Sequence, residues 1–275
     1  MRKHNFKLPS RIKRHKEKRI KSAKNKRIFV FGFTFFLISA LTFFIFLIFK
    51  IQTLKKFAYV NNNDNNVEVV VIDSLKDKYI KILIGKDFRV ESSRNYGQYK
   101  IGNLWILGMK DGFRGKLVAE TVTKNFAMPI YLWKDGRYSN LNLLQIIKSL
   151  IVQKQLFGYD YTLKTTNTPD SVLINFASDD SLLLSETETV SAKLEIVDLT
   201  GSNNLAEIIV NILGVYGVKT TSYSKGYDKD LDCEVGGINK DLVEVVSKIF
   251  SCQKELDDGG VDLKIRIGKA FADRF

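Results

Sequence analysis

The sequence has 275 residues, of which 45% are hydrophobic and 27% are charged. This composition supports a packed core and excludes a wholly disordered, collagen-like or disulfide-framework protein. The formal net charge of +13 is concentrated near the start: residues 1–27 hold 13 Lys and Arg against one acid, Glu17, whereas residues 51–275 hold 29 basic and 29 acidic residues. The later part is therefore neutral, and its average surface has no electrostatic reason to bind nucleic acid.

Residues 28–49 form an uncharged, apolar stretch that contains nine of the 19 Phe. A helix of this length extends roughly 33 Å at about 1.5 Å per residue, which matches a hydrocarbon core about 30 Å thick. We therefore predict a single transmembrane helix. A buried core helix is one alternative, but no polar face interrupts the stretch. A cleaved signal peptide is the other, but the basic region is long and the exit sequence KIQTLKKFAYV lacks a small-x-small cleavage site.

The charge distribution around this stretch predicts its orientation. Twelve net positive charges precede the span and only Lys50, Lys55 and Lys56 closely follow it, so the positive-inside rule puts the N-terminus in the cytoplasm. The expected localisation is the cell membrane, single-pass, with everything from residue 51 onward extracytoplasmic. This topology is a sufficient explanation for the basic tail, residues 1–27; binding to anionic lipid headgroups or to cytosolic RNA is the alternative.

Histidine is missing from the predicted exterior, because both histidines, His4 and His15, lie in the basic tail. A Ser-His-Asp triad, a histidine general base and a histidine metal site are thereby excluded outside the membrane, which removes most hydrolase mechanisms. We expect no cofactor and no resident metal.

One acidic cluster imitates the start of a calcium-binding loop. Asp228, Asp230 and Asp232 have the alternate spacing of such a loop, but Cys233 stands where the loop needs Gly and Asn239 where it needs the bidentate Glu. We interpret the cluster as a solvated turn that leads into a strand.

The two cysteines, Cys233 and Cys252, both belong to the predicted exterior, where disulfides form and persist. Between them the pattern indicates a strand over 231–236, a Gly-Gly turn and a helix over 239–251. Such a helix returns by roughly 20 Å, about the length of a six-residue strand, so its end comes back beside the start of the strand. We predict a disulfide; two buried free thiols are the alternative.

The hydrophobic pattern divides the exterior into two parts. The Asn-rich end of residues 50–66 cannot bury apolar area and is expected to be a polar linker. The first part, 67–185, is expected to contain strands at 67–73 and 78–84 joined as a hairpin, a helix over 110–125, a strand at 128–133, a helix over 141–156, and a few short strands in its polar end. The second part, 192–275, is expected to contain strands at 194–198, 218–224, 231–236 and 261–267 and helices over 204–216 and 239–251. The predicted fold class is α/β: a single N-terminal transmembrane helix followed by two small α/β domains.

The second part resembles the C-terminal domain of the LytR-CpsA-Psr family of bacterial cell-wall proteins. That domain opens with Asn-Gly-Thr-Gly-x-x-Gly-Leu-Ala, and the sequence here is DLTGSNNLAEIIVNILGVYG. The residues in register with the motif are Thr200, Gly201, Leu205, Ala206, Leu213 and Gly217. Those that replace motif residues are Asp198, Leu199 and Asn204. The ending IRIGKAFADRF also resembles the closing strand of that domain.

The first part resembles a shortened catalytic domain of the same family. The sequence from Val67 to Val90 aligns without a gap, and Gly85, Lys86, Asp87 and Phe88 fall where the family has Pro, Arg, Asp and Thr. KIGNLWILG and MPIYLW resemble later stretches of that domain, and the resemblance weakens beyond about residue 150. It implies a degenerate LytR-CpsA-Psr-like domain over 67–185.

The resemblance implies transfer of a lipid-linked glycan from its pyrophosphate carrier to peptidoglycan, with arginines on the pyrophosphate and aspartates on a divalent metal. The expected arginines are absent. Asn63 and Asn65 occupy the Arg and Asp positions of the first motif, Lys86 replaces the Arg of the second, and residues 138–265 contain no Arg. Lysine lacks the guanidinium fork that binds phosphate bidentately, so we interpret Lys86 and Asp87 as a remnant or an incidental surface pair.

Two functions remain. The first is a non-catalytic envelope protein that acts in cell-wall or envelope glycan binding and assembly, with peptidoglycan or another envelope glycan as partner and the membrane bound through 28–49. The second is a phosphotransferase in which Asp87, with Asp64, binds Mg²⁺ and Lys86 faces a polyprenyl pyrophosphate. A third interpretation, in which the basic tail acts and the exterior is a sensor, is weaker. A filled core in the first domain would favour the binding protein, and a deep apolar groove beside Lys86 the enzyme.

Overall fold

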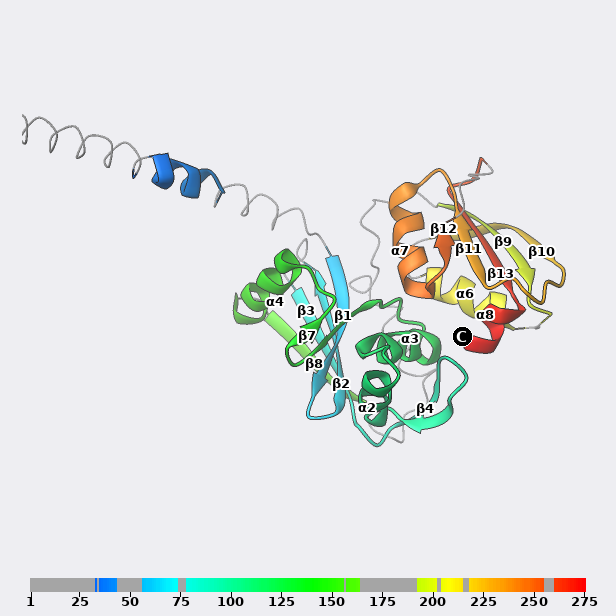
Figure 1. The fold of residues 1–275 in the computed structure, drawn as a ribbon, viewed down its shortest axis with the longest axis horizontal. Coiled ribbons are helices and arrows are strands. Elements are labelled where there is room, and N and C mark those ends of the chain that lie inside the picture. The colour runs from blue at the N-terminus through cyan, green and yellow to red at the C-terminus, as the bar shows by residue number, and fades with distance from the viewer. Residues whose placement is uncertain are drawn as a thin grey trace, which may run out of the picture. The chain divides into compact units, whose positions relative to one another are not determined.

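The computed structural model describes residues 33, 35–43, 56–73, 78–155, 157–163, 192–201, 204–214, 218–254 and 260–275. The chain forms two compact units, Met1–Thr53 and Leu54–Phe275. The second unit is mixed α/β with two large sheets (Figure 1), so the α/β class predicted for this part of the chain is confirmed.

In the first unit the described residues, 33 and 35–43, are helical and exposed. Most of the predicted span, 28–49, and the whole basic tail, 1–27, lie outside the described residues. Within the part of the chain that the structure describes, no helix combines the length and the apolar content needed to cross a bilayer.

The first sheet of the second unit has six strands in the order β7-β6-β1-β2-β3-β8. Their bounds are β1 Lys56–Asn63, β2 Asn66–Asp73, β3 Lys78–Ile84, β6 Leu132–Asp135, β7 Tyr138–Ser139 and β8 Phe157–Leu163. β1, β2 and β3 are antiparallel neighbours, β6 is parallel to β1, and β8 is parallel to β3. The predicted hairpin of 67–73 and 78–84 is confirmed, with Val71 opposite Ile80.

Within the predicted linker, 50–66, residues Lys56–Asn63 form strand β1, so the expectation of a polar linker is wrong there. Its Asn-rich end closes a hairpin with β2, in which Asp64 and Asn65 take the left-handed backbone conformation with φ of 52° and 65°. Asn and Asp adopt this conformation more readily than most residues. The strand is stabilised by main-chain pairing with β2 and by the Asn62 amide, which donates to Asp135 at 2.7 Å. Apolar content alone therefore underestimates the tendency of residues 56–63 to form a strand.

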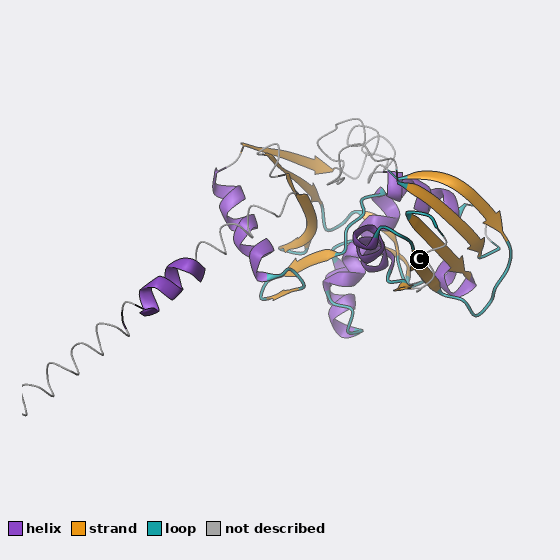
Figure 2. Cartoon of the chain, turned by 90° about the horizontal axis from the view of Figure 1, so that it is seen from above, coloured by secondary structure: helices purple, strands orange, loops and turns teal. Residues whose placement is uncertain are grey.

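Helices cover both faces of this sheet. α2 (Asn103–Lys110) and α3 (Gly115–Phe126) pack on one face, and α4 (Leu143–Gln155) lies on the other (Figure 2). The middle strand β2 therefore buries side chains in both directions: Val69 points into the α2 and α3 side and Val70 into the other, and both are fully buried. A strand covered on both sides explains the nearly continuous apolar sequence VEVVVID.

The helices of this part differ partly from prediction. The expected helix over 110–125 is α3, which begins later than expected. The helical conformation is interrupted at Asp111 and Gly112, where Gly112 has a φ of 81°. α2, immediately before this break, was not predicted as a helix. The predicted helix over 141–156 is confirmed as α4, and the strand expected at 128–133 is β6, shifted toward the C-terminus. Two short strands, β4 (Arg89–Ser92) and β5 (Gly97–Lys100), form a separate hairpin.

The second sheet has the order β10-β9-β13-β11-β12. Its elements are β9 Lys193–Leu199, α6 Leu205–Gly214, β10 Lys219–Lys225, β11 Cys233–Gly236, α7 Lys240–Phe250, β12 Gln253–Lys254, β13 Leu263–Gly268 and α8 Lys269–Arg274. The predicted strands and helices of this part are all present. β13 lies in the middle, parallel to β9 and antiparallel to β11.

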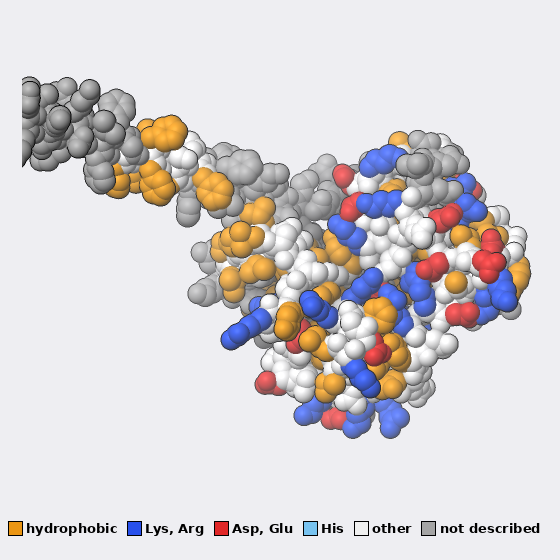
Figure 3. Space-filling model, in the orientation of Figure 1, with side chains coloured by type: hydrophobic (Ala, Val, Ile, Leu, Met, Phe, Trp, Pro, Cys, Tyr) orange, Lys and Arg blue, Asp and Glu red, His pale blue; other side chains and the backbone are white. Residues whose placement is uncertain are grey.

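This second sheet is covered on one face. Side chains such as Ile196 and Ile265 alternate inward to the core formed with α6 and α7, whereas their neighbours form cross-strand charge pairs on the other face. In these pairs Lys264 lies 3.7 Å from Glu195, and Arg266 lies 2.9 Å from Glu234. On the molecular face in Figure 3, basic and acidic side chains are interspersed, in keeping with the neutral charge of residues 51–275.

Candidate functional site

The two residues of the predicted catalytic remnant, Lys86 and Asp87, lie in an exposed turn between β3 and β4. The ammonium of Lys100 donates to the Asp87 carboxylate at 2.7 Å, and both side chains are largely exposed. This hydrogen bond, with the positive charge of Lys100, lowers the pKa of the Asp87 carboxyl below its usual value. Asp87 is therefore an ionised surface carboxylate that forms an ion pair with Lys100.

Lys86 is held against the β1–β2 turn, which contains the third candidate, Asp64. The Lys86 main-chain N–H donates to the Asn66 side chain at 2.9 Å. Gly102 fits where these segments meet, because a Cβ at this position would lie 2.6 Å from the Lys86 Cβ and 2.7 Å from the Asn65 carbonyl oxygen. The structure thus brings the turns of the three candidates together. Among the described residues, however, no group of three or more His, Cys, Asp or Glu side chains could hold a metal ion.

Buried side chains fill the face of the sheet that packs against α2 and α3. Ile82 and Ile84 of β3 are fully buried against Leu104 of α2 and Leu117 of α3, which are equally buried.

The family-like motif of the second part forms the junction between β9 and α6. Thr200 is buried, and its main-chain N–H and hydroxyl both donate to one Asp198 oxygen, at 3.0 and 2.6 Å. The Tyr223 hydroxyl donates to the other oxygen at 3.0 Å. Gly201 has a φ of 71° and lies against the Tyr227 ring. Leu205 and Ala206 follow as buried residues of α6, and Gly217 lies outside the described residues. These contacts give the motif a structural role at the start of the helix.

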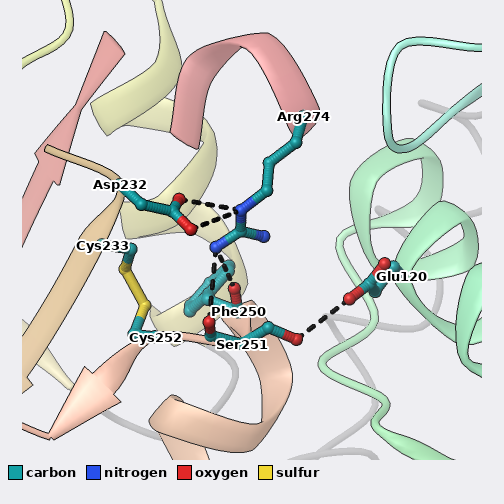
Figure 4. Close-up of a disulfide and its surroundings, with 7 residues drawn as sticks. All are labelled: Glu120, Asp232, Cys233, Phe250, Ser251, Cys252 and Arg274. Carbon is teal, nitrogen blue, oxygen red and sulfur yellow. Dashed lines mark hydrogen bonds and ion pairs between the residues drawn. A yellow bond between two sulfur atoms is a disulfide. The ribbon is translucent and has the colours of Figure 1, made fainter. Parts of the chain in front are cut away.

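Cys233 and Cys252 are joined by a disulfide across a Cα–Cα distance of 4.6 Å. Both are buried, and the bond ties β11 to the residue after the C-cap of α7 (Figure 4). Beside it, Arg274 of α8 donates to the Asp232 carboxylate at 2.8 Å and to the Phe250 carbonyl at 2.9 Å. The end of α7 is therefore held by a covalent bond and by a charged hydrogen-bond network.

A cavity of about 670 Å³ lies between α3 and α7, away from Lys86 and Asp87. α3 contributes Lys116 and Glu120, α7 and its C-terminal end contribute Ser247, Lys248 and Ser251, and the segment around β6 and the start of α4 completes the wall. Hereafter we call this cavity the α3–α7 cleft. Its remaining lining residues are Ala119, Tyr131, Leu132, Asn140, Asn142, Gln145, Ile249 and Cys252.

The floor of the α3–α7 cleft contains a buried charged group, Glu120. Arg94, in the left-handed turn between β4 and β5, donates to both Glu120 oxygens, at 2.8 and 2.7 Å. The Ser251 hydroxyl donates to the same carboxylate at 3.0 Å (Figure 4). Ser251 can do so because it ends α7 in the left-handed conformation, with a φ of 56°. A further hydrogen bond joins the β4–β5 turn to α8, since the Arg94 main-chain N–H donates to the Arg274 carbonyl.

Lysines stand at the rim of the cleft. The Lys116 ammonium lies 3.8 Å from Glu120, beyond hydrogen-bond distance. Partial burial lowers the pKa of Lys116; Glu120 opposes this shift, while Arg94 and Arg274 add to it. Lys248 lies 2.9 Å from Glu244 and 5.6 Å from the centre of the Tyr131 ring.

Amide side chains line the opposite wall. Asn142 and Gln145 form a reciprocal cap at the start of α4: the Gln145 main-chain N–H donates to the Asn142 side chain at 2.8 Å, and the Asn142 N–H to the Gln145 side chain at 2.9 Å. These bonds use the side-chain oxygens and leave the two NH₂ groups as donors. With the lysines, these NH₂ groups give the cleft several hydrogen-bond donors, and the Ser247 hydroxyl can donate or accept.

Sequence reasoning did not identify this cleft. Lys116 and Glu120 resemble an ordinary (i, i+4) pair on an exposed helix, and Ser251 an ordinary residue after a helix. Their meeting depends on the packing of α3 against α7, whose hydrogen-bonded residues Glu120 and Ser251 are 131 positions apart. The single-sequence signal that could have drawn attention to α3 is Glu120 itself, an acid within the apolar period of the helix.

No known protein family and no curated protein matches the chain. Among solved structures, a protein from Streptococcus agalactiae aligns at 12% identity over 28% of this chain and 31% of that chain, with a TM-score of 0.22. A transcriptional regulator from Enterococcus faecalis aligns at 11% identity over 74% of this chain and 91% of that one, with a TM-score of 0.26. A LytR-CPS2A-psr family protein, TagT of B. subtilis, aligns at 12% identity over 70% of this chain and 89% of that one, with a TM-score of 0.24. At these TM-scores the likeness is too slight to assign the chain to a family.

Proposed function

We propose that this protein is a single-pass membrane protein of the cell envelope, whose exterior binds an envelope glycan during wall assembly without catalysing glycan transfer. The N-terminus would be cytoplasmic, with 28–49 as the transmembrane helix and 67–185 and 192–275 extracytoplasmic. The apolar stretch and the net charge of +12 before it support this topology. The Cys233–Cys252 disulfide supports it independently, because such bonds persist in oxidising compartments and are rare in the cytosol.

The observation that carries the binding role is the position of the α3–α7 cleft. It is lined by amides, hydroxyls and lysines, and neither Lys86 nor Asp87 lines it. Amides and hydroxyls match the hydroxyl and acetamido groups of a sugar, since both partners donate and accept hydrogen bonds. The sequence resemblance to a degenerate LytR-CpsA-Psr domain and to the C-terminal domain of that family points to the same class of ligand, a wall glycan. The folded part is not proposed to bind nucleic acid.

The absence of catalysis is supported by the environment of Asp87. A metal-binding aspartate should meet further oxygen ligands, but Asp87 is hydrogen-bonded to Lys100 on an open surface. The rival is a phosphotransferase that uses Lys86, Asp87 and Asp64 with Mg²⁺ and a polyprenyl-pyrophosphate-linked glycan. Its support is the meeting of the Lys86 turn with the β1–β2 turn around Gly102.

Co-sedimentation tests the binding role. The full chain in detergent is incubated with purified peptidoglycan sacculi, and we expect it to sediment with them. Ser247→Trp fills the cleft and should reduce the bound fraction at least fivefold, whereas Ser222→Trp on exposed β10 should leave it unchanged. Far-ultraviolet circular dichroism of both variants verifies folding. Equal binding by the two folded variants would remove the cleft from the proposal.

A turnover assay separates the binding protein from the enzyme. The full chain is supplied with polyprenyl-pyrophosphate-linked glycan, sacculi and Mg²⁺, and we expect no transfer of glycan and no effect of Asp87→Ala on sedimentation. Transfer that is lost in Asp87→Ala would establish the enzyme instead. The topology is tested with protease on intact spheroplasts, which should degrade the chain from residue 51 onward and leave the basic tail intact.

A further inference from the structure

The α3–α7 cleft carries more positive charge than its own acids neutralise. Three charged residues line it: Lys116, Glu120 and Lys248. Lys248 is paired with Glu244 at 2.9 Å, and Glu120 receives two hydrogen bonds from Arg94. Glu120, the acid beside Lys116, is therefore already hydrogen-bonded to Arg94, and its carboxylate lies 3.8 Å from the Lys116 ammonium.

Arg274 does not line the cleft, and it adds no net charge to its surroundings. Arg274 is matched by Asp232, with which it forms a hydrogen bond of 2.8 Å. Glu244 is shared by Lys248 and Lys254. When these groups are counted together, five cations (Arg94, Lys116, Lys248, Lys254 and Arg274) face three acids (Glu120, Asp232 and Glu244), so the balance is positive. Of the two lysines that line the cleft, Lys248 has an acid at 2.9 Å, whereas the Lys116 ammonium lies 3.8 Å from Glu120.

The hydrogen-bonding groups show the same imbalance. The oxygens of Asn142 and Gln145 are used in the cap of α4, so these side chains offer NH₂ donors to the cleft. Gln145 and Ser247 are buried at its floor, while the Lys116 side chain is 42% exposed at its rim. A ligand with acceptors for the buried amide donors and a negative charge near the rim would complement both features.

We propose that the glycan bound in the α3–α7 cleft is anionic, and that Lys116 is the residue that recognises its carboxylate. This inference rests on the proposed glycan-binding function and specifies its ligand class. A carboxylate placed beside Lys116 restores the stabilisation that burial removes from the ammonium, so the acidic glycan binds more tightly than the neutral one.

The test compares two forms of one wall preparation. Purified sacculi are used untreated or after carbodiimide amidation, which converts carboxylates into neutral amides of nearly the same size. The full chain in detergent should bind untreated sacculi roughly tenfold more tightly than amidated ones, as expected for one charge-assisted hydrogen bond in a partly buried site. Lys116→Gln should remove this preference, and Lys116→Arg should retain it.

Lys110→Gln is the matched control, because it removes the same charge from an exposed lysine on α2, outside the cleft. It corrects for general attraction between the basic chain and the acidic wall, and it should keep the tenfold preference. If Lys116→Gln and Lys110→Gln behave alike, or if the wild type binds both preparations equally, the anionic specificity is wrong while glycan binding stands. If the wild type binds neither preparation, the proposed function itself fails.

Discussion

The guanidinium of Arg94 donates to both carboxylate oxygens of Glu120, at 2.8 and 2.7 Å. The Arg94 side chain is 17% exposed and the Glu120 side chain 7%. Arg94 also stacks at 4.2 Å on the Phe113 ring. Removing one partner of a buried pair leaves the other charge uncompensated, so Arg94→Ala should lower the free energy of unfolding by about 3 kcal/mol. Urea denaturation of the full chain in detergent, followed by Trp fluorescence, measures this change.

The control for Arg94→Ala is Lys100→Ala, which breaks the exposed ion pair with Asp87. Pairs of this kind contribute less than about 1 kcal/mol, because water screens them and ordering the side chains costs entropy. Similar losses in the two variants would show that burial of the Arg94–Glu120 pair has no energetic effect.

The disulfide should contribute measurably to the stability of the second sheet. Its cysteines are 19 positions apart, and closing a loop of this length in the unfolded chain is worth about 3 kcal/mol. The double variant Cys233→Ser, Cys252→Ser should unfold at lower urea than the wild type by that amount. Reductant should bring the wild type close to the variant and leave the variant unaffected; a wild type indifferent to reductant would contradict the prediction.

The Glu244 carboxyl should titrate far below its usual range. Hydrogen bonds from Lys254 and Lys248 lower the pKa of Glu244 from 4.5 to about 2. Since the pKa is lowered in the folded state, the stabilisation is present above pH 4.5 and is lost as the pH falls toward 2. Carboxyl chemical shifts in an NMR titration should show this midpoint. Lys254→Gln should move it upward, whereas Lys219→Gln on β10 should not, and identical midpoints in both variants would rule out the ion pair with Lys254.

The close approach at Gly102 gives a steric test of the Lys86 turn. A Cβ here would overlap the Lys86 Cβ and the Asn65 carbonyl oxygen, so Gly102→Ala should lower the free energy of unfolding by about 1–3 kcal/mol. Gly85→Ala is the matched control, because no atom lies within 4 Å of its added Cβ. Urea denaturation should separate the two variants, and equal stabilities would mean that the turns are not packed as described.

Elements with a clear hydrophobic period were predictable from sequence. β9 alternates buried and less buried side chains along Lys193–Leu199, and the N-cap of α7 is Asn239, whose side chain accepts from the Leu242 N–H at 3.1 Å. β1 was missed because its asparagines pair through the main chain, which apolar content does not report. α2 was missed because a helix of eight residues has too few turns to establish a period.

The candidate site was less predictable than the fold. Lys86, Asp87 and Asp64 were found by alignment to a motif, and a motif does not report whether a cavity lies beside it. The α3–α7 cleft depends instead on long-range packing, in which Glu120 meets a turn from earlier in the chain and a helix end from much later. Such an arrangement leaves no local pattern in a single sequence.

The position of β13 has a consequence for the order of assembly. It lies between β9 and β11, which do not pair with each other, yet it follows both in the sequence. A chain that is synthesised from the N-terminus cannot complete this sheet until residues 263–268 have been added. Both cysteines precede that strand, so the disulfide can join α7 to β11 while the edges of β9 and β11 that face β13 are still unpaired. Unpaired strand edges of this kind are sites of aggregation until the last strand is in place.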